Sequence, residues 1–141
     1  MRILKNIFGK KTKLHVDNAA DSIGRLLGFL IITNFSTSGT TGYIEWGNGF
    51  KVAWNRSVTI RFDVSDRMAG SWVLPVTFDP QKSTAIGSHP NSHMDLKFRG
   101  NIGASVTTGN SAHVRMWSTT TNQPYVSGDS YICQVLVIGF S

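Results

Sequence analysis

Hydrophobic and polar residues alternate along most of this chain with a period of two, the period of a β-strand that has one buried and one solvated face. The clearest example lies around the turn Gly47-Asn48-Gly49, where Asn and Gly tolerate the positive φ of a tight hairpin. Two further alternating runs follow, separated by a break at Asn55. We therefore expect a three-stranded antiparallel meander over residues 42–64, with the rest of the chain packed on its apolar face. That face comprises Phe50, Val52, Trp54, Val58, Ile60 and Phe62.

Similar runs, separated by turn signals every 8–12 residues, continue to the end of the chain. Together they predict an all-β fold, an antiparallel β-sandwich of about nine or ten strands. The run at 72–78 contains Pro75, which lacks a ladder donor and therefore indicates a sheet edge or a bulge. Beyond the meander, the expected strands cover residues 26–35, 72–78, 84–87, 93–99, 106–108, 112–117 and 131–140.

The beginning of the chain has a different pattern. Ile3, Leu4, Ile7 and Phe8 have helical spacing, and a second helical pattern follows within residues 17–27. Helices this short are marginal in water, so they need a partner surface in this domain or in a neighbouring chain. We expect a short helical arm over residues 1–25 and a β-sandwich domain over residues 26–141.

The charge of the chain is concentrated in this arm. The formal net charge is +6, and residues 1–13 hold five of the fourteen basic residues and no acid. The rest of the chain is nearly neutral, which argues against a nucleic-acid partner. The basic arm could bind an acidic partner or anionic lipid, or could be a solvated or packed segment. The longest apolar run, 26–32, is too short to span a membrane.

Signals for catalysis or metal binding are weak. The single cysteine, Cys133, lies in an apolar strand-like run and is expected to be buried and unreactive. His89 and His93 are four residues apart with Asp95 nearby, but Pro90 and the alternating pattern indicate a loop and a strand, not a metal-binding helix. No nucleophile motif or marked carboxylate pair is present. We expect no enzymatic activity, no metal and no cofactor.

Trp117 is the most promising binding residue. By alternation it shares a side with His113 and Arg115, away from Val114 and Met116, and it precedes a polar loop over residues 118–129. Loops of this length are uncommon in compact domains unless they are functional. Aromatic faces with amide and guanidinium donors suit sugar recognition, while packing against a neighbouring subunit would use the same aromatic residue. The predicted binding residues are Arg115, Trp117, Asn122, Gln123 and Tyr125.

The order of four motifs in residues 42–141 resembles the C-terminal tip domains of bacteriophage tail fibres, in particular the gp53-like tail fibre family. Residues 1–35 do not match the family pattern, and residues 65–71 form an additional polar turn. The motifs are Gly42-Tyr43, Ile44-Glu45-Trp46-Gly47, the proline-containing run 72–80, and the run 131–140 with its Ile-Gly-Phe ending.

The resemblance implies a trimeric, β-rich receptor-binding tip at the distal end of a tail fibre in a virion. With the residues around Trp117, it leads us to expect non-enzymatic attachment to a host cell-surface glycan or lipopolysaccharide. Residues 1–13 would then contact other tail components. The alternative is a structural virion or assembly protein that trimerises and docks through its basic arm.

Overall fold

The computed structural model describes residues 23, 31–90, 96–119 and 124–141. These residues form an all-β, antiparallel fold, as the alternating pattern predicts. The predicted helical arm and its boundary at residue 25 lie outside the described residues, except for Ile23. The elements are β1 (Ile32–Ser38), β2 (Thr41–Trp46), β3 (Phe50–Val64), β4 (Arg67–Val73), β5 (Ser83–Ser88), the 3₁₀ helix η1 (Leu96–Phe98), β6 (Asn101–Thr108), β7 (Ser111–Trp117) and β8 (Ser130–Phe140).

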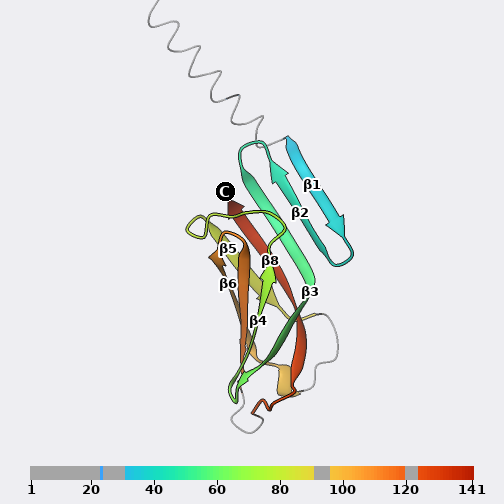
Figure 1. The fold of residues 1–141 in the computed structure, drawn as a ribbon, viewed down its shortest axis with the longest axis vertical. Coiled ribbons are helices and arrows are strands. Elements are labelled where there is room, and N and C mark those ends of the chain that lie inside the picture. Colours follow the sequence, from blue (N-terminus) through green and yellow to red (C-terminus); the bar gives the residue numbers. More distant parts are fainter. Residues whose placement is uncertain (1–22, 24–30, 91–95, 120–123) are drawn as a thin grey trace, which may run out of the picture.

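All eight of these strands belong to one hydrogen-bonded sheet (Figure 1). The order runs β1-β2-β3-β4-β7-β6, and β8 pairs with both β3 and β5. The expected division into the two sheets of a sandwich is therefore not confirmed, and the described residues contain fewer strands than the nine or ten predicted. Instead the sheet curls, and Gly87 of β5 lies so close to Ile102 of β6 that a Cβ at Gly87 would overlap the Ile102 side chain.

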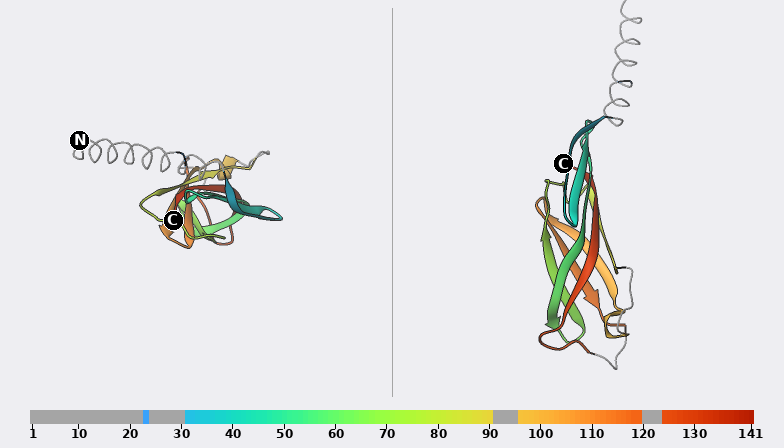
Figure 2. Two further views of the ribbon diagram at one scale, coloured as in Figure 1. Left: turned by 90° about the horizontal axis from the view of Figure 1, so that it is seen from above. Right: turned by 90° about the vertical axis from the view of Figure 1, so that its right-hand side faces the viewer.

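The fifteen-residue strand β3 joins two parts of the molecule. Along one edge it pairs with β8 over almost its whole length. Along the other edge it pairs first with β2 and then with β4. The hairpin β1–β2, which we call the wing, therefore extends from a body formed by β3, β4, β5, β6, β7 and β8 (Figures 1 and 2).

A bulge in β3 reverses which side chains face the core. The register with β8 shifts between Asn55 and Val58. After the bulge Val58 and Ile60 are buried, as predicted, but before it the buried residues are Lys51 and Ala53. The expectation that Phe50, Val52 and Trp54 pack on the core is therefore wrong. An extra residue in a strand moves every later side chain to the opposite face.

The core lies inside the curled sheet. Cys133 is fully buried there, its Sγ lies 3.4 Å from the carbonyl oxygen of Val58, and burial raises the pKa of its thiol to about 11. The thiol is thus buried and unreactive at neutral pH, as expected from the sequence. The buried hydrophobic residues are Ala53, Val58, Ile60, Met68, Trp72, Leu74, Phe78, Ala112, Val114, Met116, Tyr125, Cys133, Val135 and Val137.

Several predicted strands differ from the structure. The runs on either side of Asn55, expected as separate strands of a three-stranded meander, form the single strand β3. The run at 72–78 leaves the sheet after Val73, and its backbone then bonds to a turn, from Leu74 N to Asn110 O and from Phe78 N to Gly109 O. Pro75 cannot donate to a strand ladder, which explains why the strand ends just before it. The predicted strand at 93–99 contains η1 instead, with residues 91–95 outside the described residues.

Candidate functional site

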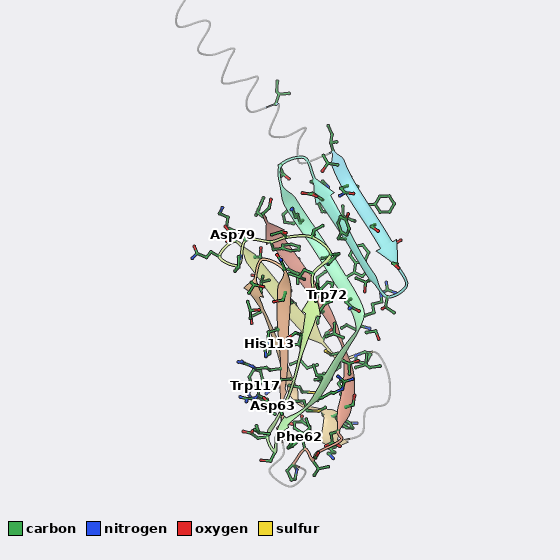
Figure 3. The ribbon with its side chains drawn as sticks, in the orientation of Figure 1. Phe62, Asp63, Trp72, Asp79, His113 and Trp117 are labelled. Atoms are coloured by element: carbon green, nitrogen blue, oxygen red, sulfur yellow. The ribbon has the colours of Figure 1, made fainter. Side chains whose placement is uncertain are left out.

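The outer face of β7 carries two of the three predicted binding residues that the structure describes, Arg115 and Trp117. Ala112, Val114 and Met116 are buried, so His113, Arg115 and Trp117 point away from the core. The alternation read from the sequence is therefore correct for this strand. Figure 3 shows that His113 and Trp117 lie along one strand, with Trp117 nearer to the end marked by Phe62 and Asp63.

Small side chains flank His113 and Arg115 on both neighbouring strands. Ser71 of β4 and Ser105 of β6 are in register with His113, and Ala69 and Gly103 are in register with Arg115. Small neighbours leave room beside the longer side chains of β7. The result is a shallow groove of about 160 Å³, lined by Gly103, Ala104, Ser105, His113, Arg115 and Trp117.

Gly103 fixes the position of the Trp117 indole. A Cβ at Gly103 would lie 2.9 Å from Cζ3 and 3.3 Å from Cη2 of Trp117. The ring therefore lies directly over the glycine and would have to move for any larger residue. Its exposed fraction is 39%, so the indole presents apolar surface to solvent at one end of the groove.

The polar groups of the groove are suited to hydroxyl or anionic ligands. Arg67 is paired with Asp63 at 2.7 Å, whereas Arg115 forms no ion pair with any residue that the structure describes. His113 Nδ1 lies 3.2 Å from Ser71 Oγ. The face thus combines an unneutralised guanidinium, an imidazole, two serine hydroxyls and an exposed indole.

Tyr125 does not belong to this face, although the sequence placed it there. It is 1% exposed and stacks on Phe98, with ring centroids 6.4 Å apart. Its hydroxyl has no hydrogen-bond partner among the described residues, and burial raises its pKa. Tyr125 is therefore a core residue that anchors the end of the loop. Asn122 and Gln123 lie outside the described residues.

Sequence reasoning missed the small residues that shape the groove. Ser71, Gly103 and Ser105 come from two other strands, 42 to 8 residues away from His113 along the chain. Only the pairing register of the strands brings these residues together, and no local sequence pattern predicts that register. The local alternation around Arg115 was enough to find the central strand but not its neighbours.

Of His89 and His93, only His89 lies in the described part of the chain. His89 Nε2 lies 2.8 Å from Gly100 O, and since a carbonyl only accepts, Nε2 must carry the hydrogen. The other ring nitrogen, Nδ1, lies 3.1 Å from Tyr131 Oη. His93 is not described. Among the described residues no cluster of three or more His, Cys, Asp or Glu could hold a metal ion. No helix in that same part is long and apolar enough to cross a membrane.

Comparison with known proteins gives matches at the level of structure. No protein-family model and no curated protein sequence matches the chain, so membership of the gp53-like family is not confirmed. An R2-type pyocin tail fibre has a TM-score of 0.51 at 13% identity, over 77% of this chain and 39% of that fibre. An R1-type pyocin tail fibre gives 0.47 at 10% identity, over 89% and 94% of the two chains. The chain thus spans well under half the R2-type fibre, and its fold is similar to part of that fibre.

Proposed function

We propose that this chain is the receptor-binding tip of a phage or phage-like tail fibre, working as a homotrimer. It would bind a cell-surface glycan, including lipopolysaccharide, without enzymatic activity and at the distal end of the fibre. One observation carries the proposal. The exposed indole of Trp117 and the unpaired guanidinium of Arg115 border one groove on a rigid strand. The similarity of fold to a pyocin tail fibre supports it.

The position of the groove supports a distal role. The first continuously described range begins at Ile31, whose carbonyl oxygen accepts a hydrogen bond from Gly47 N at the wing end of the molecule. Trp117 is in register with Arg67, beside the turn that joins β3 to β4 at the opposite end (Figure 1). If residues 1–30 lead to the rest of a fibre, the Trp117 end of the groove points away from it.

The chemistry of the groove fits a charged or hydroxylated sugar. An indole stacks on the apolar face of a sugar ring, and Arg115 would bind a phosphate or carboxylate such as those of lipopolysaccharide. A groove of about 160 Å³ encloses little of a ligand, so each site would be weak. Three sites on one trimer would give strong attachment through multivalency. Asn122 and Gln123 follow Trp117 closely in sequence and stay in the proposed site.

Binding to a glycan array and to whole cells tests this proposal. The double variant Trp117→Ala, Arg115→Ala should lose at least tenfold in binding while its thermal midpoint changes little, because both side chains are exposed. The matched control is Ile132→Ala, an exposed residue on β8 outside the groove. Binding by the double variant equal to that of the control would contradict the proposal.

The alternative is a structural virion protein that trimerises and docks through residues 1–13. The observation that favours it is the five basic residues of that segment, beside a nearly neutral remainder. Deletion of residues 1–13 should then abolish assembly with other tail components in a pull-down. Under this alternative, the Trp117 and Arg115 variants would assemble as the unchanged protein does, and the array would show no glycan binding.

A further inference from the structure

One outer face of the sheet, at the wing end of the molecule, is apolar across five adjacent strands. The pairing registers place its side chains in rows that run from β1 through β2, β3 and β8 to β5. We call this surface the apolar face. Its first row is Phe35, Ile44, Val52, Ile138 and Thr84, its second row is Thr37, Gly42, Trp54, Leu136 and Ile86, and Ile32, Trp46, Phe50 and Phe140 lie beyond the first row.

The rows of the apolar face contain no charged residue, Arg56 lies at the border of its groove, and several side chains of the face are open to solvent. The exposed fraction is 66% for Phe35, 53% for Ile32 and 50% for Ile86. On the same strands the chain buries a lysine on the inner side, where Lys51 is 7% exposed. A contiguous apolar surface of this kind on a soluble protein marks an interaction site.

The edge of the apolar face is also open. All seven residues of β1 are exposed, so both faces of this strand lack a cover. Among the described residues, β1 pairs only with β2. An unpaired edge usually carries charges, proline or a bulge that prevents association. β1 has a register shift near Ile32 but neither a charged residue nor a proline.

The protruding side chain of Phe35 and a groove on the same face have complementary shapes. The groove has a volume of about 350 Å³ and is lined by Trp54, Asn55, Arg56, Ile86, Ser88, Gln134, Val135 and Leu136. The Trp54 indole lies over Gly42, where a Cβ would overlap the ring. Phe35 protrudes from β1, four strand spacings from Ile86 on β5, or roughly 19 Å. Phe35 cannot fill the groove of its own chain, but the Phe35 of another copy can.

We propose that the apolar face is covered by a second copy of this chain, with Phe35 of one copy seated in the Trp54–Ile86 groove of the next. The face measures roughly 19 Å by 20 Å, or about 400 Å² in projection, about half of what each partner contributes to a stable interface. A single contact between two faces is therefore small. In a closed ring each chain gives its groove to one neighbour and its β1 to the other, so both ends of the face are covered and every chain makes two contacts. Only the number of copies, three, rests on the proposed function.

Engineered disulfides test the contact in the full chain. Thr37→Cys lies two residues from Phe35, and Ser88→Cys lines the groove, so the double variant keeps both Phe35 and Ile86. The two positions are roughly 19 Å apart within one chain, far beyond the ~7 Å that a disulfide can bridge, so any bond between them joins two chains. Cys133 is fully buried and stays out of the reaction.

On mild oxidation we expect covalent dimers and closed trimers on a non-reducing gel. The control variant Thr37→Cys, Val73→Cys should run as a monomer on the same gel, because Val73 lies on β4, outside the apolar face. Adding Phe35→Asp to the first pair should reduce cross-linking at least tenfold. The proposal is overturned if the first pair gives no interchain bond, or if Phe35→Asp leaves its yield unchanged. Neither result bears on the proposed glycan binding in the Trp117 groove, which is measured separately.

Discussion

Lys51 Nζ lies 3.1 Å from Glu45 Oε1 and 3.1 Å from the carbonyl oxygen of Thr77. Glu45 belongs to the wing strand β2, Lys51 to β3, and Thr77 to the irregular segment after β4. The ammonium group therefore ties together three parts of the fold. A buried lysine is costly unless it is paired in this way.

Removing one partner of this pair should destabilise the protein. We expect Glu45→Ala to lower the free energy of unfolding by about 1–3 kcal/mol, less than for a fully buried pair, because Glu45 is 26% exposed. The double variant Glu45→Ala, Lys51→Met should recover most of the loss, since no buried charge is left without its partner. Urea denaturation at fixed protein concentration measures both. Lys82→Ala, which breaks an exposed pair with Asp79, is the control and should change little.

Stability should fall in acid partly through Asp129. The hydrogen bond from Lys97, at 2.6 Å, and that from Val126 N lower the pKa of this carboxyl below its ordinary value of 3.8. A lowered folded-state pKa means that the stabilisation is present above about pH 4 and is lost as the pH falls through the folded-state value. Asp129→Asn should therefore flatten the acid side of the stability profile, measured by thermal midpoint from pH 6 to pH 2. The control is Asp66→Asn. If the thermal midpoint of Asp129→Asn falls with decreasing pH as steeply as that of the control, the prediction is contradicted.

Tyr125 should tolerate loss of its hydroxyl but not of its ring. The hydroxyl is buried without a partner among the described residues, so Tyr125→Phe should leave stability unchanged or raise it by up to about 2 kcal/mol. Tyr125→Ala should cost about 3–5 kcal/mol through loss of the ring. Tyr131→Phe is the matched comparison, because that hydroxyl bonds to His89 and its removal should destabilise. Urea denaturation should rank Tyr125→Phe as the most stable of the three variants, Tyr131→Phe below it and Tyr125→Ala as the least stable.

Gly103→Ala should affect binding more than stability. The new methyl group would meet only the outer atoms of the Trp117 ring, which can swing into solvent, so unfolding should change by less than about 1 kcal/mol. The displaced indole would no longer border the groove, and glycan binding should fall several-fold. Titration of a bound glycan, alongside thermal melting, separates the two effects. Normal affinity in Gly103→Ala would mean that the position of the ring is unimportant.

Local alternation predicted the strands well, but long-range geometry limited what the sequence could say about their faces. The pattern at Val114 and Trp117 was right because strand β7 is regular. In β3 the bulge after Asn55 inverted the pattern, and although the alternation breaks at Asn55, the local sequence does not show that an extra residue is inserted there. Tyr125 looked exposed because its neighbours are polar, whereas its burial comes from Phe98, 27 residues earlier in the chain.

The pairing of β3 with β8 also determines how the chain must fold. Phe50 lies opposite Phe140, and Arg61 lies opposite Ser130, so these contacts close loops of about 70 to 90 residues. Because β8 lies between β3 and β5, the edges of these two strands that face β8 have no partner until residues 130–140 have been synthesised. Such a high contact order implies folding in milliseconds to seconds, slow for a chain of this size. During synthesis the edges of β3 and β5 stay unpaired, which makes the nascent chain prone to aggregation until its last strand is in place.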